Sequence, residues 1–70
     1  MPSVILEGPA IKDIETRRTL VKELTDSVSR AYGLPKGTIV ILIKENSPEN
    51  VSIGGQLIVD RLRSDPGKPD

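Results

Sequence analysis

Two aliphatic runs, one near the start of the chain and one in its middle, set narrow limits on the fold. Residues 39–43 are five consecutive aliphatic side chains, and residues 4–6 form a shorter run of the same kind. An apolar run without polar alternation is typical of a strand that is covered on both faces, as parallel strands are. Residues 3–6 and 38–44 are therefore predicted to be strands.

The segment between these runs has the periodicity of one long helix. From residue 14 to residue 32 the apolar side chains recur at steps of three, four and seven, which is the spacing of one helical face. These positions are Ile14, Val21, Leu24, Val28 and Ala31 or Tyr32, and Leu20 flanks them. Asp13 suits the N-cap, Gly33 suits the left-handed residue after the last turn, and Pro35 prevents continuation. A strand, a crossover helix and a second strand predict a right-handed β-α-β unit with parallel strands.

The remainder of the chain points to assembly. Two strands and one helix leave one sheet face bare, so we expect that face to meet another subunit. Gly54-Gly55 separates residues 51–53 from residues 56–59, which predicts a hairpin arm that packs on a neighbouring subunit. The predicted fold is thus an α/β subunit with two parallel strands, one long helix and a C-terminal hairpin arm, assembled into an oligomer. We expect one domain over residues 1–63 and a disordered tail over residues 64–70.

Composition excludes several kinds of site. The 70 residues include no cysteine and no histidine, which excludes disulfides, thiolate metal sites and a histidine base. The polar loop 45–50 lacks the Asp-rich ligand spacing of a hard-cation site, so no metal is expected and the loop is interpreted as a solvated connection. A core this small contributes only about 3–5 kcal/mol net, and oligomerisation is the remaining source of stability.

Charge and hydropathy limit the classes of molecule that this chain is expected to bind. Ten basic and ten acidic residues give zero net charge, and Tyr32 is the sole aromatic residue, so nucleic-acid binding is not expected. No apolar run approaches the length of a membrane span, and no signal peptide opens the chain. We therefore expect a cytoplasmic protein with no membrane partner.

The start of the chain carries the strongest candidate for chemistry. Initiator methionine is usually removed before a small second residue, and this processing would leave Pro2 with a free secondary amine at the end of a strand. Such an amine is a nitrogen base held by a rigid ring, and proline suits the first residue of a strand because it donates no ladder hydrogen bond. Burial and a nearby cation both disfavour the charged form, which would keep the base available. The alternative is that Met-Pro is a common start without function.

Cations supply the other candidates. Lys12 has a functional interpretation, in which it binds a carboxylate or steadies a developing enolate, and a structural one, an exposed lysine just before the helix. Arg17 and Arg18 either reach the site from the helix start or form a solvated face. Arg61 and Arg63 are candidates for a carboxylate clamp from another subunit. Gly54-Gly55 is interpreted as structural, because the spacing of a phosphate-binding glycine motif is absent.

Several motifs together resemble the 4-oxalocrotonate tautomerase family. They are Met-Pro at the start, a short strand ending Leu6-Glu7-Gly8, Arg18-Thr19-Leu20-Val21 at the opening of the long helix, the strand 39–43 followed by Glu45, and Val51-Ser52-Ile53-Gly54-Gly55. The resemblance covers residues 2–63. It is closest to small archaeal-type members with Gly-Pro after the first strand and Glu-Asn-Val before the glycine pair.

The resemblance implies a β-α-β subunit in a homohexamer, a trimer of dimers, with active sites at subunit boundaries. It implies that the N-terminal proline removes a proton from a dienol and returns one at another carbon, without metal or organic cofactor. Family members bind a dicarboxylate with two arginines and cover the site with an aromatic residue. Here the strand arginine falls on Val40 and the aromatic on Val51, while the loop arginine falls on Lys12 or Pro9, depending on the direction of counting.

The leading hypothesis is an isomerase that acts on a small 2-hydroxy-dienoate or related enol carboxylate, with Pro2 as general base. Its rival is a non-catalytic oligomeric scaffold or small-molecule binding module that keeps the fold. The missing strand arginine and aromatic residue favour the rival, and retention of Met1 in the mature chain would decide for it.

Overall fold

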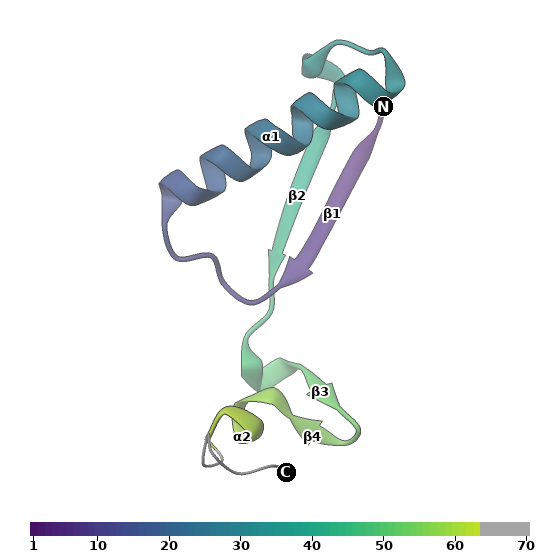
Figure 1. Cartoon of the computed structure of the whole chain (residues 1–70). Coiled ribbons are helices and arrows are strands. Elements are labelled where there is room, and N and C mark those ends of the chain that lie inside the picture. Colours follow the sequence, from purple (N-terminus) through teal and green to yellow (C-terminus); the bar gives the residue numbers. More distant parts are fainter. Residues whose placement is uncertain (64–70) are drawn as a thin grey trace.

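The computed structural model describes residues 1–63, and the predicted tail over residues 64–70 lies outside them. The predicted strands and long helix occur in the predicted order, and two 3₁₀ turns and a second helix occur in addition (Figure 1). The elements are β1 (Ser3–Gly8), α1 (Ile14–Tyr32), a 3₁₀ turn (Lys36–Thr38), β2 (Val40–Glu45), a second 3₁₀ turn (Pro48–Asn50), β3 (Ser52–Ile53), β4 (Gln56–Leu57) and α2 (Ile58–Arg63). β1 and β2 are parallel, and their register runs from Ser3 opposite Val40 to Gly8 opposite Glu45. The predicted β-α-β unit and the C-terminal antiparallel hairpin are confirmed.

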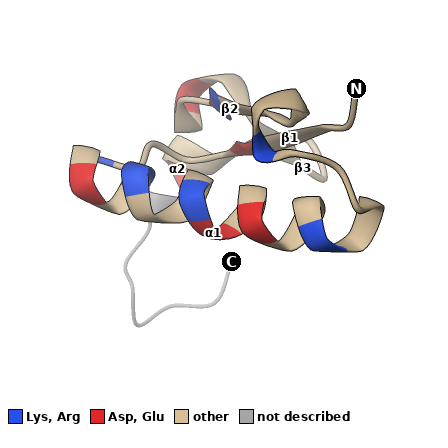
Figure 2. Cartoon of the chain, turned by 90° about the horizontal axis from the view of Figure 1, so that it is seen from above, with Lys and Arg blue, Asp and Glu red and all other residues tan. Residues whose placement is uncertain are grey.

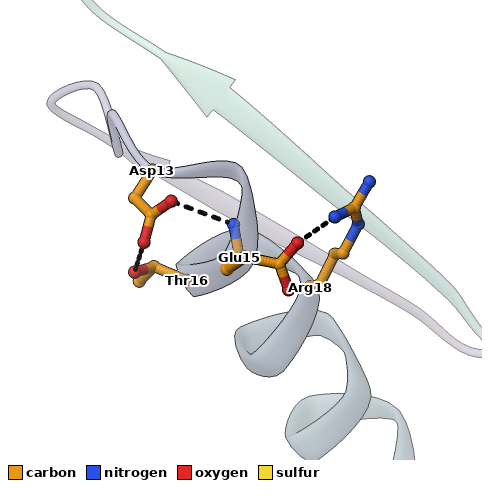
Figure 3. A network of polar contacts seen from close by, with 4 residues as sticks. All are labelled: Asp13, Glu15, Thr16 and Arg18. Atoms are coloured by element: carbon orange, nitrogen blue, oxygen red, sulfur yellow. Dashed lines mark hydrogen bonds and ion pairs between the residues drawn. The ribbon is translucent and has the colours of Figure 1, made fainter.

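Helix α1 has the predicted bounds because local capping groups mark both of its ends. The Asp13 carboxylate accepts the Glu15 backbone N–H at 3.2 Å and the Thr16 hydroxyl at 3.1 Å (Figure 3). At the other end Gly33 has a φ of 67°, and its N–H donates to the Ser29 carbonyl at 2.8 Å. These contacts satisfy backbone groups that a helix leaves unpaired at its ends.

One face of the two-stranded sheet packs against α1, and the other is open. Side chains along both strands alternate, and the half-buried ones on the helix side are Val4, Leu6, Ile41 and Ile43. They meet the half-buried middle of α1, whose apolar residues are Leu20, Val21, Leu24 and Val28. On the opposite face Ile5, Val40 and Leu42 remain 57%, 42% and 46% exposed. The bare sheet face predicted from two strands and one helix is therefore present.

Three of the differences from the predicted strand boundaries follow from specific contacts. β1 continues to Gly8 instead of ending at residue 6, because β2 runs alongside it to Glu45 and the Asn46 N–H donates to the Gly8 carbonyl at 2.7 Å. The second strand starts at Val40 rather than residue 38, because a 3₁₀ turn precedes it and the Thr38 hydroxyl donates to the Pro35 carbonyl at 2.7 Å.

The third difference lies in the arm. The predicted strand over residues 56–59 ends at Leu57, and Ile58 begins α2. The Ile58 N–H donates to the Val51 carbonyl at 2.8 Å, after which the ladder stops. Asp60 then places negative charge in the first turn of the helix, where the helix dipole favours it.

The subunit is elongated and has no enclosed core. Its radius of gyration is 16.5 Å and its extents are 48 × 25 × 17 Å, whereas a compact chain of this length has a radius of about 11 Å. None of the side chains described in residues 1–61 is fully buried. The arm of β3, β4 and α2 continues beyond the carboxyl ends of β1 and β2 (Figure 1). Much of the apolar surface of this chain is therefore left for contact with other molecules.

Charges of both signs are spread along α1 rather than gathered in one patch (Figure 2). Arg18 pairs with Glu15, and the Lys36 ammonium nitrogen lies 2.8 Å from an Asp26 carboxylate oxygen. Within residues 1–63 no helix combines the length and the apolar character needed to cross a membrane.

Candidate active site

Pro2 lies at the amino end of β1, beside the start of β2. Its carbonyl accepts the Val40 N–H at 3.0 Å, so the backbone at Pro2 is held by the sheet. The residue is half-buried, whereas Met1 leaves 91% of its surface exposed. Removal of Met1 would therefore cost little packing and would leave the amine of Pro2 at a defined position.

Val40 is the predicted site residue that the fold brings to Pro2. It pairs with Ser3 in the parallel register and donates to the Pro2 carbonyl. Its side chain is 42% exposed and shares the open sheet face with Ile5 and Leu42. On this face Val40 lies beside Ser3, and its contact with Pro2 is the backbone hydrogen bond.

The predicted cations lie at the other end of the sheet. Lys12 is exposed in the loop that follows β1, and Arg17 and Arg18 belong to the first turns of α1. β1 has six residues and spans roughly 20 Å at about 3.3 Å per residue, so it separates Pro2 from this loop. A parallel crossover has this consequence, because the connecting helix must start where the first strand ends. One subunit does not bring Pro2 and Lys12 together.

The two arginines make different ion pairs. Arg18 pairs with Glu15, and both side chains are about two-thirds exposed, at 65% and 69% (Figure 3). Arg17 pairs with Glu45, and these side chains are 35% and 36% exposed. The Nε of Arg17 is buried without a hydrogen-bond partner. Arg17 is thus the more enclosed of the two and is engaged by a residue at the end of β2.

Glu45 is a residue that sequence reasoning missed. It was interpreted as part of a solvated loop, yet it ends β2 opposite Gly8, and its carboxylate accepts the Ile11 N–H at 3.2 Å in addition to the Arg17 guanidinium. The available signal was an acidic residue two positions after the aliphatic run 39–43. Its partners are 28 and 34 positions away, so local patterns could not identify them.

Val51 also lies away from Pro2 in the same chain. It is half-buried and lines a surface pocket of about 330 Å³ beyond the carboxyl ends of the strands. The other lining residues are Glu7, Gly8, Pro9, Asn46, Pro48 and Ile58. The pocket therefore gathers Val51 and Pro9, two positions at which the family resemblance places site residues. A further hollow of about 400 Å³ lies along the first half of α1, and its lining residues are Asp13, Glu15, Thr16, Thr19, Leu20 and Glu23.

The remaining candidates belong to the arm. Gly54 and Gly55 have φ values of 62° and 86° and form the tight turn between β3 and β4, which confirms their structural interpretation. Arg61 is exposed on α2, and Arg63 is the last residue of that helix. Among residues 1–63, no group of three or more His, Cys, Asp and Glu side chains is placed to hold a metal ion.

Comparison with known proteins identifies the family. The model of the tautomerase enzyme family matches residues 2–61, which is most of the chain. This chain belongs to the tautomerase family. A probable tautomerase of Lactiplantibacillus plantarum is 35% identical to it over 60 residues. The aligned residues cover 86% of this chain and 94% of the Lactiplantibacillus protein.

Solved structures agree with the assignment. The crystal structure of DmpI from Archaeoglobus fulgidus is 41% identical, covers 84% of this chain and all of that one, and superposes with a TM-score of 0.75. A 4-oxalocrotonate tautomerase isozyme from Methylibium petroleiphilum is 25% identical, with coverages of 91% and 100% and a TM-score of 0.82. The predicted membership of the 4-oxalocrotonate tautomerase family and the tautomerase-like fold are confirmed. At the level of the family, tautomerase activity is supported.

Proposed function

We propose that the mature chain is a cofactor-independent tautomerase in which Pro2 is the general base. The observation that carries the proposal is the placement of Pro2 at the open end of β1, with its carbonyl bonded to Val40 and only an exposed Met1 before it. After removal of Met1 its nitrogen has no role in the sheet and is free to accept a proton. The substrate class is a small 2-hydroxy-dienoate or a related enol carboxylate.

The reaction needs one group that moves a proton and one that draws electron density. The Pro2 amine takes the proton of the enol hydroxyl, the O–H electron pair forms the carbonyl while the π electrons shift along the conjugated system, and the protonated amine returns the proton to a carbon further along the substrate. Lys12 binds the substrate carboxylate and stabilises the negative charge that develops. Val40 and Val51 supply apolar walls that keep the amine neutral. An amine base placed in this way contributes typically about 10²–10⁴-fold to a rate.

The arginines rank below Lys12 as carboxylate ligands. The pair between Arg18 and Glu15 is exposed, and such pairs contribute at most about 1 kcal/mol, so Arg18 is available to turn toward a substrate. Arg17 is held by Glu45 in a more enclosed pair. We propose Arg18 as the second cation of the site, with Arg17 as the third candidate.

Because the proposed residues lie at two ends of a subunit, the site requires more than one copy of the chain. We propose a homo-oligomer, with a hexamer built as a trimer of dimers, in which a neighbour places Lys12 and Val51 near Pro2. The open face of Ile5, Val40 and Leu42 and the large radius of gyration support assembly. One domain over residues 1–63 and a location in the cytoplasm belong to the same proposal.

The rate of ketonisation of 2-hydroxymuconate, compared between the mature protein and its Pro2→Ala variant, tests the proposal. Alanine also permits removal of Met1, so the variant replaces only the secondary amine, and mass spectrometry verifies the processing of both. We expect the variant to lose at least about a hundredfold in kcat/KM. Ser3→Ala is the control, because it alters the neighbouring residue and keeps the N-terminal proline. Equal rates in the wild type and Pro2→Ala would overturn the mechanism.

A second candidate function is a non-catalytic oligomeric scaffold or a module that binds small molecules. The valines at positions 40 and 51, in place of the arginine and the aromatic residue of the family, favour it. The mass of the mature chain separates the two functions. A chain that keeps Met1 has no secondary amine and cannot use Pro2 as a base.

A further inference from the structure

Glu45 joins three segments that are distant in the sequence. Glu45 is the last residue of β2. One of its carboxylate oxygens accepts hydrogen bonds from the backbone N–H of Ile11, at 3.2 Å, and from the guanidinium of Arg17. Ile11 lies in the loop after β1, and Arg17 lies in the first turns of α1. The carboxylate therefore connects the end of the second strand, the connecting loop and the start of the helix.

This connection surrounds Lys12 on both sides. Ile11, directly before it, is held by Glu45, and Asp13, directly after it, is held as the N-cap of α1. The Asp13 carbonyl also accepts the Arg17 N–H at 3.2 Å. The side chain of Lys12 is exposed, so the loop backbone rather than side-chain packing determines where its ammonium group can reach.

Arg17 also neutralises the negative charge of Glu45. Hydrogen bonds to a carboxylate are stronger than those to a neutral acceptor, so the negative charge of Glu45 strengthens its hold on the Ile11 N–H. The same charge, left unpaired, would attract the Lys12 ammonium and repel an anionic substrate. Arg17 neutralises it at contact distance, and the pair is only about one-third exposed, which limits screening by solvent.

We propose that Glu45 and Arg17 are positioning residues that hold the loop of Lys12 and leave its ammonium group free for the carboxylate of the substrate. This inference rests on the proposed function, in which Lys12 binds that carboxylate. It assigns Arg17 a role inside the subunit instead of a direct contact with substrate.

Glu45→Gln tests the inference, with Glu15→Gln as the matched control. Both substitutions remove one negative charge and one ion pair with an arginine of α1, but only the first touches Ile11. We expect Glu45→Gln to accelerate amide hydrogen exchange at Ile11 and to raise KM for 2-hydroxymuconate about fivefold. Glu15→Gln should leave amide hydrogen exchange at Ile11 unchanged, because Glu15 does not contact Ile11.

A double variant distinguishes positioning from a general effect on the fold. If Glu45 acts through Lys12, Glu45→Gln should add nothing to the rise in KM that Lys12→Ala already causes. A further fivefold rise in the Lys12→Ala background would overturn the inference, as would unchanged Ile11 exchange in Glu45→Gln. Sedimentation of each variant verifies that the oligomer is the same as in the wild type.

A conservative pair of variants keeps the inference testable if Glu45→Gln fails to fold. Arg17→Lys retains a cation for Glu45 and should preserve KM, whereas Arg17→Met should raise it, and equal KM values in both would contradict the role of Arg17.

Failure of the proposed function has a different signature. Pro2→Ala would then keep full activity, while Ile11 exchange in the Glu45 variant would still report whether the connection exists.

Discussion

Asp26 lies half-buried on α1, and Lys36 reaches it from the 3₁₀ turn with its ammonium nitrogen 2.8 Å from a carboxylate oxygen. The hydrogen bond from Lys36 lowers the pKa of the Asp26 carboxyl below its ordinary value of 3.8, and with the charges of Lys36, Arg30 and Lys22 it outweighs partial burial, which raises it. Because the folded-state pKa is the lower one, the pair stabilises the fold above the unfolded-state pKa, and this stabilisation is lost as the pH falls through the lowered value. We expect Lys36→Met to return the pKa of Asp26 toward 3.8. The variant should then lose less of its free energy of unfolding than the wild type when the pH falls from neutral to below the lowered pKa. An NMR titration of the Asp26 carboxyl measures the change, and identical titrations in the two proteins would contradict the pairing.

At the scale of elements, the end of α1 depends on one backbone conformation. Gly33 has a φ of 67°, and no atom lies within 4 Å of the position a Cβ would take. The cost of a side chain there is therefore backbone strain and not a clash, and Gly33→Ala should reduce the free energy of unfolding by about 1 kcal/mol. Gly37→Ala is the control, since its surroundings are equally open and its φ is not positive. Denaturant unfolding of both variants measures the difference, and equal losses of stability would disprove a special role for Gly33.

At the scale of the whole molecule, an aspartate on one face of β2 should have a different effect from an aspartate on the other face. Ile41 faces α1 within the subunit, whereas Leu42 lies on the open face and is 46% exposed. We expect Ile41→Asp to unfold the subunit, because a charge without a partner is costly against an apolar surface. Leu42→Asp should instead dissociate the oligomer and leave the helical content of each subunit largely intact. Sedimentation gives the size of the assembly and circular dichroism the helical content. A Leu42→Asp protein with the mass of the wild-type assembly would refute a subunit contact on that face.

The amino-acid sequence by itself determined the local elements. The bounds of α1 follow from Asp13, Gly33 and Pro35, because capping and termination act within a few residues of a helix end. The two aliphatic runs determined the strands, although the ladder between β1 and β2 extends to residues that no local pattern selects. The candidate base was also a local matter, since Met-Pro defines an N-terminal amine without reference to the rest of the chain.

Only the tertiary structure decided how the candidates are distributed. A parallel crossover carries the chain to the far end of β1 before α1 begins, so Lys12 and Arg17 lie at one end of the sheet and Pro2 with Val40 at the other. The role of Glu45 depends on contacts across 28 and 34 residues, which no periodicity encodes. The sequence predicted a bare sheet face, and the paired strands decided that Ile5 and Leu42 lie on it. Local physical chemistry specified the elements and the candidate base, and long-range packing specified which residues of one subunit meet and which lie apart.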